Sequence, residues 1–325
     1  MIATVDEVSV SVIQQMEQLA PFGVNNPTPK VMIENVSLTQ MRRIGSEANH
    51  LKVQFTQNGA SLDGIGFHLG YLFEEMTNQA KISAVGTLSI NEWNGHVKPQ
   101  LMLEDLAVCH WQLFDWRSVQ ISKLKERLLM IPEEERVVIA FHSETSDTLG
   151  ISELNVTPVQ QLTSIENRYL ILLDAPSQLV QLQSLLKEKG IPSRIYMIFH
   201  QQEDHFFSTQ PSREQFKWFY AFLLKQSTFP LQRSDELAKH KGWSKGTIEF
   251  MTNVFCELGF AQLKEGTLTV VPNPEKKSLE DSATFQRRIE QTKVEHELIY
   301  SSYEQVKQWF EEVLEQNDMK IKETV

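Results

Sequence analysis

The most regular alternation of hydrophobic and polar positions in the chain runs over residues 81–106. Apolar residues or glycine occupy every second position from Ile82 to Ile90, which is typical of a β-strand with one buried face. Asn94-Gly95 then supplies two adjacent residues that tolerate the positive φ of a tight turn. Alternation resumes after the turn, where Pro99 lacks an N–H and indicates an edge or a bulge. The pattern predicts a β-hairpin.

Three further strands are predicted upstream of this hairpin. Residues 50–56 alternate, Asn58-Gly59 forms a turn, and residues 61–67 return along the first strand. A short apolar run at residues 31–36 gives another strand. Five short antiparallel strands within about eighty residues predict a small Greek-key barrel of the OB type.

A short helix and a connector are predicted before the barrel. Val12, Met16 and Leu19 recur at helical spacing, and the helix should end at Ala20 because Pro21 disfavours helical geometry in the residue before it. Residues 20–29 are rich in proline and asparagine, which predicts an irregular connector.

An aromatic segment follows the barrel at residues 109–117. Trp111, Phe114 and Trp116 could stack on nucleic-acid bases or pack one domain against the next. Packing is favoured, because aromatic side chains bury large areas at such contacts.

Residues 118–211 have the pattern of an α/β domain. Continuous apolar runs at residues 136–141, 169–173 and 194–199 are typical of strands buried on both faces. A helix with a leucine-rich face is predicted from Pro176 to Gly190. Strand, helix and strand in this order predict a parallel sheet with a right-handed crossover.

Two polar features of this region are candidates for chemistry. Asp174 follows the second strand, where α/β enzymes often hold a metal or a nucleotide, but neither GxxxxGKS/T nor GxGxxG occurs in the chain. A role as helix N-cap is the favoured interpretation of Asp174. Residues 200–205, with His200 and His205 at the ends, have ligand-like side chains at a spacing that fits no recognised zinc pattern. A polar loop is favoured over a metal enzyme site.

Residues 212–274 predict a winged helix-turn-helix module, with helices near 216–224, 234–240 and 244–258 followed by a hairpin at 261–271. Ser234 and Ser244 are the expected N-caps of the second and third helices. Lys245, Thr247 and Ile248 would begin the recognition helix.

Charge limits what this module can bind. It holds 8 Lys/Arg against 6 Asp/Glu, a small surplus for contacts with duplex phosphates. The candidate contacts to DNA or to a protein partner are Lys239, Lys241, Lys245 and Lys264. Binding to a protein, or packing as an internal module, is the alternative.

Composition describes a soluble multidomain protein. The chain has 325 residues, 41% hydrophobic and 22% charged, and a net charge of −11 that argues against a surface devoted wholly to nucleic acid. No apolar run approaches the roughly 20 residues of a membrane span, so no membrane association is expected. The N-terminal residues lack signal-peptide features, and two cysteines without a CxxC motif give no disulfide framework or zinc knuckle. A cytoplasmic location follows.

Four motifs resemble one protein family in order and spacing. They are PFGVNNPTP at residues 21–29, IGSEANHLKVQF at 44–55, LDGIGFHLG at 62–70 and NEWNGHVKPQL at 91–101. They are similar to the OB domain of RecJ, the bacterial 5′→3′ single-strand-specific DNA exonuclease, over residues 10–117. Asn25 departs from the glycine of many members. The remainder resembles the extra C-terminal region of RecJ proteins from Bacillus-like and Staphylococcus-like bacteria.

The resemblance also points to a missing part. RecJ chemistry belongs to a DHH phosphoesterase core that uses Mn²⁺ or Mg²⁺ to activate water. No Asp-His-His or Gly-Gly-His motif occurs in this chain, so no catalytic residue, metal ligand or cofactor is carried over. We expect a C-terminal portion, separated from an upstream nuclease core either by truncation or as a natural fragment, and inactive alone.

The predicted fold is therefore an α+β multidomain chain. Residues 1–29 form a helix and connector, 30–117 an OB-type five-stranded barrel, 118–211 a parallel α/β domain, 212–274 a winged-helix-like module, and 275–325 a C-terminal helical segment and tail.

The resemblance implies that the barrel holds single-stranded DNA, which requires cations along the backbone and exposed rings for base stacking. The candidates are Arg42, Arg43, His50, Lys52, His96 and Lys98 as the cations, and Phe67 and Trp93 as the rings. Alternatively, Trp93 caps the barrel end and Phe67 belongs to the core.

The expected partners are single-stranded DNA and the upstream DHH nuclease core. One rival interpretation is a docking module that recruits the nuclease to repair or replication proteins, such as single-strand binding protein through its acidic tail. The other is a regulator that binds duplex DNA through the winged helix.

Overall fold

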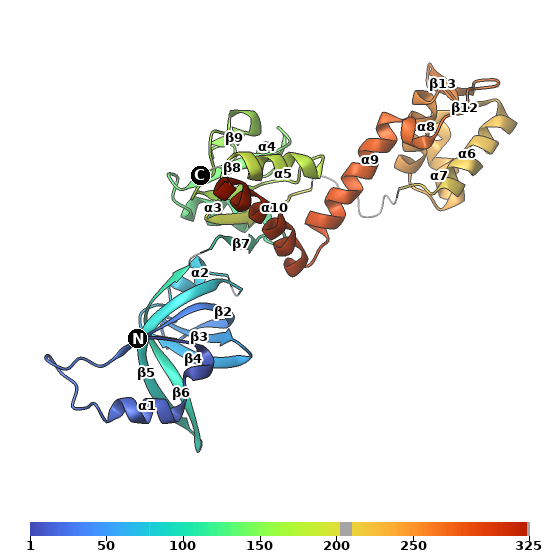
Figure 1. Cartoon of the computed structure of the whole chain (residues 1–325). Helices are drawn as coiled ribbons and strands as arrows, with labels where there is room; N and C mark the ends of the chain where they lie inside the picture. Colours follow the sequence, from blue (N-terminus) through green and yellow to red (C-terminus); the bar gives the residue numbers. More distant parts are fainter. Residues whose placement is uncertain (78, 109, 202–209, 324–325) are drawn as a thin grey trace. The chain divides into compact units, whose positions relative to one another are not determined.

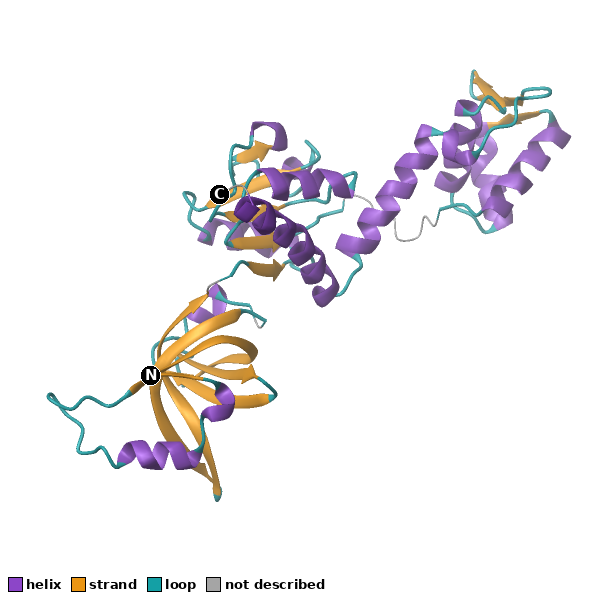
Figure 2. Ribbon diagram, in the orientation of Figure 1, coloured by secondary structure: helices purple, strands orange, loops and turns teal. Residues whose placement is uncertain are grey.

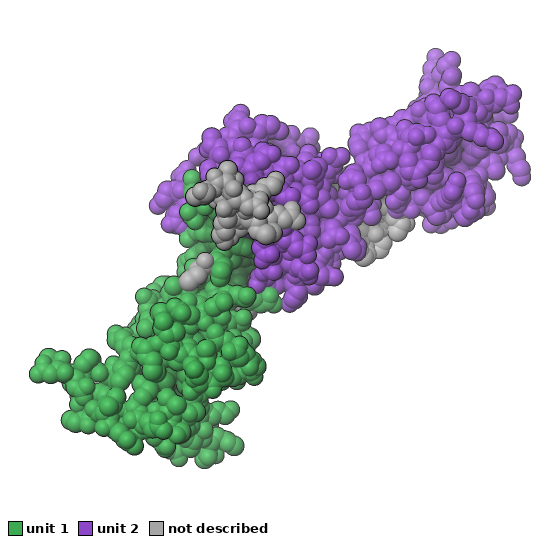
Figure 3. Space-filling view, in the orientation of Figure 1, with its two compact units in different colours: residues 1–114, 166–170, 191–196 green, residues 115–165, 171–190, 197–325 purple. Residues whose placement is uncertain are grey.

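A computed structural model of the chain describes residues 1–77, 79–108, 110–201 and 210–323, with side chains up to Glu315. These residues divide into two compact units, coloured green and purple in Figure 3. The first contains residues 1–114, 166–170 and 191–196, and the second contains residues 115–165, 171–190 and 197–325. The predicted domain boundaries at residues 29, 117, 211 and 274 stay predictions.

The first unit contains the predicted five-stranded barrel (Figures 1 and 2). Its strands are β2 (Lys30–Ile44), β3 (His50–Gln57), β4 (Ala60–Gly66), β5 (Lys81–Trp93) and β6 (His96–Val108). The sheet order is β1-β2-β3-β4-β6-β5, and β2 also pairs with β5, which closes the barrel. The short β1 (Ile2–Ala3) pairs in parallel with β2, and α2 (Leu72–Glu75) joins β4 to β5. The OB-type barrel is confirmed.

Alternate residues of the barrel strands fill its core, as the period-2 pattern predicts. Leu51, Val53 and Phe55 of β3 are at most 1% exposed. Two glycines admit close approaches: a Cβ on Gly64 would lie 2.6 Å from the Phe55 ring, and one on Gly86 would lie 2.1 Å from a backbone oxygen of β6. A side chain at either position would therefore force the strands apart.

The predicted hairpin is confirmed in detail. Asn94 and Gly95 have φ of 48° and 74°, and Trp93 pairs with His96 across the turn. Pro99 lies beyond Gln100–Met102, the only stretch of β6 in the described residues that pairs with β4, so β6 has an open edge there. The register shift lies elsewhere, between Val85 and Gly86.

The N-terminal helix α1 (Val10–Glu17) ends three residues before the predicted position at Ala20. Its buried residue is Ile13, whereas Leu19 is 60% exposed, so the predicted apolar face was wrong at its end. The side-chain amide of Asn26 donates to the carbonyl oxygens of Leu19 and Pro21, at 2.9 and 3.1 Å. This amide supplies hydrogen bonds that a continued helix would otherwise provide.

A second sheet has the order β7-β11-β10-β8-β9 and carries helices on its faces (Figure 1). Its strands are β7 (Gln112–Asp115), β8 (Arg136–Ala140), β9 (Val156–Pro158), β10 (Tyr169–Leu172) and β11 (Arg194–Met197). The helices are α3 (Ile121–Met130), α4 (Thr145–Thr148) and α5 (Leu179–Glu188). β8 and β9 pair in parallel, and the parallel α/β architecture is confirmed.

Two predictions about this region were wrong. Helix α5 begins at Leu179 rather than Pro176, and its N-cap is Gln178 rather than Asp174. Asp174 is 3% exposed and accepts hydrogen bonds from the backbone N–H groups of Phe141 and His142, at 2.6 and 2.9 Å. It ties the end of β10 to the loop after β8, a tertiary role that sequence position alone did not reveal.

The predicted winged-helix order is present, with one additional strand. The elements are α6 (Arg213–Gln226), β12 (Thr228–Pro230), α7 (Ser234–Lys241), α8 (Lys245–Glu257), β13 (Ala261–Lys264) and β14 (Thr267–Val270), with sheet order β12-β14-β13. Ser244 caps α8 as predicted, because its Oγ accepts from the N–H of Thr247 at 3.1 Å. The N-cap of α7 is Arg233, and Ser234 is instead a buried first helical residue.

The C-terminal segment contains α9 (Ala283–Val294), a π-helical turn at Glu295–Ile299 and α10 (Tyr303–Glu323). Short 3₁₀ turns cover Val5–Glu7, Val159–Gln161, Leu231–Arg233 and Leu279–Asp281. Phe285 of α9 packs into the aromatic core of the winged helix, and Phe310 of α10 is fully buried. Within the described ranges, no helix combines the length and apolar character needed to cross a bilayer.

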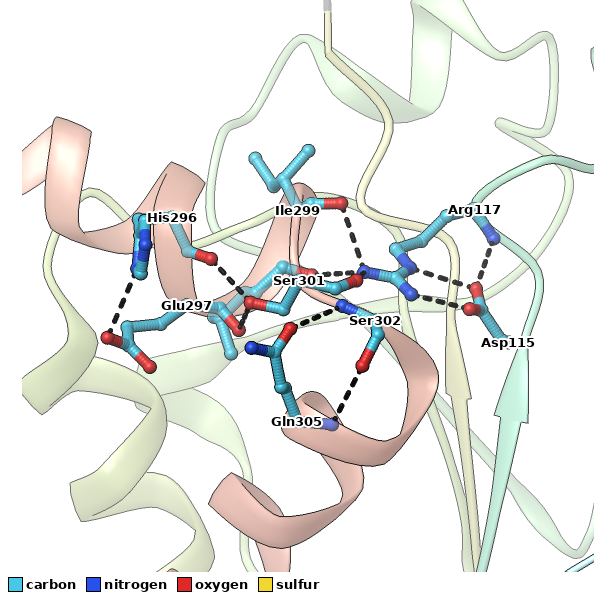
Figure 4. A network of polar contacts seen from close by, with 9 residues as sticks. Asp115, Arg117, His296, Glu297, Ile299, Ser301, Ser302 and Gln305 are labelled. Carbon is cyan, nitrogen blue, oxygen red and sulfur yellow. Dashed lines mark hydrogen bonds and ion pairs between the residues drawn. The ribbon is translucent and has the colours of Figure 1, made fainter.

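The guanidinium of Arg117 fixes the turn between α9 and α10 (Figure 4). Its Nη1 donates to the carbonyl oxygens of Leu298, Ile299 and Ser301 at 2.9, 3.0 and 2.9 Å. Its Nε and Nη2 donate to the carboxylate of Asp115 at 2.9 and 2.6 Å. Carbonyl groups at the end of a helical turn lack intrahelical donors, and Arg117 supplies them.

Candidate nucleic-acid interface

A row of side chains crosses the outer surface of the barrel. Arg42 of β2 stands opposite Lys52 of β3, which stands opposite Ile65 of β4. Ile65 in turn pairs with Met102 of β6, and Met102 with Thr87 of β5. Directly paired residues project from the same face of a sheet. Because the intervening Leu51 and Val53 point into the core, this row faces outward.

The β5–β6 hairpin also turns alternate residues outward. Counting by twos from the Thr87–Met102 pair reaches Asn91 opposite Lys98, and then Trp93 opposite His96. At the other end of β3, His50 is two residues from Lys52 and so shares its face. The candidate residues that this register turns outward are Arg42, His50, Lys52, Trp93, His96 and Lys98, and we call this outward-pointing set the outer barrel face.

The two candidate rings are open to solvent. Phe67, directly after β4, is 55% exposed, and Trp93 is 73% exposed. Phe67 is therefore not a core residue, and Trp93 does not cap the barrel end. The Phe67 ring lies edge-on to the His50 ring, with centroids 5.1 Å apart. Rings exposed to this degree can stack on unpaired bases.

His50 is held in one orientation. Its Nδ1 accepts a hydrogen bond from the N–H of His68 at 3.1 Å. Nδ1 must therefore offer a lone pair, which places the proton on Nε2 and makes that atom a donor. The His68 ring lies edge-on to it, with centroids 5.1 Å apart. His50 thus contributes a directed hydrogen-bond donor to this end of the outer barrel face.

Arg43 is separated from Arg42 by the strand's alternation. Arg43 stands opposite the buried Leu51, so it projects from the other face. Its Nε donates to the carbonyl of Gly70 at 3.0 Å, and its Nη2 lies 3.1 Å from Glu74 Oε1. The guanidinium also lies 5.2 Å from the centre of the Phe73 ring. These contacts occupy Arg43 in holding α2 against the barrel.

The charge of the outer barrel face is modest. Lys52 Nζ lies 3.8 Å from the carboxylate of Asp63, so part of its charge is compensated. Arg42 and Lys98 have no acidic partner among the residues that the structure describes. Two uncompensated cations with exposed rings suit a weak, salt-sensitive contact with a nucleic-acid strand.

Sequence reasoning missed one exposed ring near this face. Tyr71 is 63% exposed and lies between β4 and α2, four residues after Phe67. The motif GFHLGY at residues 66–71 contains both Phe67 and Tyr71, so the sequence offered a second candidate ring. Only the structure shows that both rings are exposed to solvent.

The winged-helix candidates lie in less favourable surroundings. Lys241 Nζ lies 3.8 Å from the centre of the Trp218 ring, and Lys245 Nζ lies 3.8 Å from Glu249. Lys239 and Lys264 are exposed. Thr247 and Ile248 lie in the first turn of α8, as predicted, but both are buried, so neither is available to contact DNA. Glu249 and Glu257 on the exposed side of α8 would repel phosphates.

The remaining candidates do not form a site. Phe114 is 9% exposed and stacks on Tyr196 with centroids 4.6 Å apart, which is packing rather than base recognition. Of residues 200–205, only His200 and Gln201 fall within the described residues. In all the parts of the chain that the structure describes, no three His, Cys, Asp or Glu side chains are grouped so that they could hold a metal ion.

Comparison with known proteins agrees with this architecture. Residues 112–310 match the family described as "Single-strand DNA-specific exonuclease, C terminal domain", and residues 1–105 match the family described as "RecJ OB domain". The single-stranded-DNA-specific exonuclease RecJ of Bacillus subtilis is 39% identical over 325 residues, covering 98% of this chain. The chain spans 41% of the length of that relative.

Solved structures give weaker likenesses. RecJ from Thermus thermophilus in complex with Mn²⁺ has 15% identity and a TM-score of 0.24, covering 74% of this chain and 32% of that one. The mitochondrial single-stranded DNA binding protein Rim1 of S. cerevisiae has 13% identity and a TM-score of 0.22, covering 25% and 95%. Scores this low carry no argument. From the family matches, this chain belongs to the single-strand DNA-specific exonuclease C-terminal family and carries a RecJ OB domain.

Proposed function

We propose that this chain is the DNA-holding C-terminal part of a RecJ-like 5′→3′ exonuclease of DNA repair and recombination. It binds single-stranded DNA through the outer barrel face and does not cut DNA by itself. The observation that supports the proposal is the strand register, which turns Arg42, Lys98 and Trp93 outward from the barrel rather than into its core.

The exposed rings of the barrel favour single strands over duplex. Stacking on Phe67 and Trp93 requires bases whose flat faces are uncovered, and a duplex hides them. Stacking contributes about 1–3 kcal/mol per base and tolerates any sequence. Such a surface suits an exonuclease, which must accept every sequence that enters it.

Cutting is assigned to the rest of the parent protein. The described residues do not fit the divalent metal site that a DHH nuclease core requires, and the chain lacks the corresponding motifs. We therefore place the nuclease core, and its need for Mn²⁺ or Mg²⁺, outside this chain, and we assign no hydrolytic step on DNA to its residues.

Fluorescence anisotropy with a labelled oligothymidine of roughly 20 nucleotides, longer than most OB sites, tests the proposal. We expect binding at about tens of micromolar protein that weakens with salt, and a preference over a hairpin duplex of equal charge. The variant Arg42→Ala/Trp93→Ala should bind at least about tenfold more weakly. Equal affinity of this variant and the unchanged chain would contradict the proposal.

A second function is favoured by the winged helix. Leu224 and Leu263 of this module are 54% and 45% exposed, and the exposed Lys239 and Lys264 are cations that an acidic peptide can contact. We propose that this module docks a protein partner, such as single-strand binding protein through its acidic tail. A labelled tail peptide should bind the whole chain and lose affinity in Lys239→Glu/Lys264→Glu. Oligothymidine that competes fully with the peptide would contradict a separate docking site.

A further inference from the structure

A serine, a histidine and an aspartate meet beyond the ends of two neighbouring strands in the α/β sheet. His142 follows β8, Asp174 follows β10, and Ser177 precedes α5. Asp174 Oδ2 lies 3.1 Å from His142 Nδ1, and His142 Nε2 lies 3.2 Å from Ser177 Oγ. None of these three residues belongs to the outer barrel face, so the proposed DNA binding does not explain their arrangement.

The hydrogen bonds of Asp174 set the proton position on His142. The carboxylate accepts from two backbone N–H groups and from the hydroxyl of Thr145 at 2.6 Å. Because the carboxylate is surrounded by donors, His142 Nδ1 must donate to it as well. Nε2 of the neutral ring is then the acceptor, and the Ser177 hydroxyl donates to it. An oriented base beside a hydroxyl is the requirement for an activated serine.

The topology places this trio where α/β sheets carry ligands. From β8 the sheet grows to one side through β9 and to the other side through β10. The order of strands therefore reverses between β8 and β10, and ligands of open α/β sheets lie outside the carboxyl ends of strands at such a point. The first-turn N–H groups of α5, two and three residues after Ser177, lack intrahelical acceptors, and a helix N-terminus favours negative charge nearby.

We propose that Ser177 is a nucleophile that His142 activates and Asp174 orients, and that it hydrolyses carboxylic esters. Ser177 Oγ attacks the acyl carbon while its proton passes to His142 Nε2. The C–O bond to the alcohol breaks, and the leaving oxygen takes that proton. Water then attacks the acyl-serine, again losing its proton to Nε2, which returns it to Ser177 Oγ as the acid leaves. Asp174 is a positioning residue throughout.

The surroundings define the class of ester. The His142 side chain is 51% exposed and Ser177 is exposed, so the site is open to solvent. An open site offers little binding energy for a large apolar acyl group, and it favours small or activated acyl esters. The site uses no residue of the outer barrel face, so the esterase proposal and the DNA-binding proposal can be tested independently.

Labelling of the whole chain with a fluorophosphonate probe tests the nucleophile. We expect Ser177 to be the modified residue, identified by peptide mass, and p-nitrophenyl acetate to be hydrolysed in competition with the probe. Ser177→Ala should abolish both signals, and His142→Gln should slow labelling by at least about 100-fold. Ser143→Ala, a change of an exposed serine beside His142, should leave both unchanged.

Two outcomes would overturn the proposal: no labelling of Ser177 in the unchanged chain, or labelling at the same rate in His142→Gln. Both changed side chains are exposed, so loss of folding would not explain a difference, and circular dichroism checks this.

The positioning role of Asp174 has its own signature. Imidazole ¹⁵N spectra should show His142 protonated at Nδ1 and not at Nε2, with the signal assigned by its absence in His142→Gln. In Asp174→Asn this preference should be lost and labelling should slow together with it. A spectrum of the unchanged chain with the proton on Nε2 would contradict the arrangement.

Discussion

The Nη1 atom of Arg117 lies 2.9 Å from the carbonyl oxygen of Leu298, a residue 181 positions later in the chain. The same guanidinium forms an ion pair with Asp115, and the Arg117 side chain is only 14% exposed. The residue after β7 thereby fixes the turn that separates α9 from α10 (Figure 4). The C-terminal helix packs through this contact as well as through its apolar face.

Replacing Arg117 by Met should destabilise the packing of α10 by about 3 kcal/mol, because buried carbonyls and Asp115 lose their charged donor. Hydrogen exchange of the backbone amides in α10 measures the local effect. Arg233→Met is the matched control, because Arg233 is 67% exposed and its ion pair, with Glu236, lies one turn away on the same helix. Equal protection of α10 in both variants would argue against the anchor.

The neighbours Arg42 and Arg43 should respond oppositely to alanine. Arg42→Ala removes a cation of the outer barrel face, so affinity for oligothymidine should fall and the salt slope should lessen by about 0.7. Arg43→Ala breaks contacts to α2, so it should lower stability and leave the salt slope unchanged. Anisotropy titrations at several salt concentrations, together with urea unfolding, separate the two effects. A smaller slope in both variants would refute the assignment of faces.

Trp93 and Val97 give a matched pair on one hairpin. Trp93→Ala should weaken single-strand binding by about 1–3 kcal/mol if a base stacks on the ring. Val97 is 47% exposed but adjacent to His96, so it projects from the opposite side of the ribbon, and Val97→Ala should have no effect on binding. Quenching of Trp93 fluorescence by oligothymidine provides a second measurement. Failure of DNA to quench it would count against stacking there.

Glu257 should make the junction of α8 and α9 sensitive to acid. Burial acts to raise its pKa, but hydrogen bonds from Ser282 and Thr284 outweigh burial and hold the pKa below its ordinary value. The folded state therefore binds the proton less readily than the unfolded state. The resulting stability is present above the ordinary glutamate pKa of about 4.3 and is lost as pH falls through the lower folded value.

Glu257→Gln should consequently cost roughly 1 kcal/mol near neutral pH, the usual contribution of a helix cap, and little in strong acid, where the carboxyl is protonated in either state. Urea unfolding at about pH 7 and about pH 3 makes the comparison. Glu249→Gln, a change on the same exposed helix side, should show no such pH-dependent difference. A penalty that is equal at both pH values would exclude the carboxylate as its cause.

The alternation of apolar residues was enough to predict the barrel hairpin and its turn. The side-chain period of a strand is two, and Asn94-Gly95 suits the positive φ of both turn residues. Ser244 could also be predicted as a helix cap, because its partner lies three residues away in the same segment. Both features depend on residues within the same short segment, so the sequence alone is enough to predict them.

Features that depend on distant partners were decided only by the tertiary structure. Arg42 and Arg43 are equivalent cations in the sequence, but strand register sends one to the outer barrel face and the other to Gly70. Asp174 read alone suggests a helix cap, yet its carboxylate reaches a loop 32 residues earlier and meets His142. Hydrogen bonds act over about 3 Å of space whatever the separation along the chain, so only the folded arrangement determines which polar groups become partners.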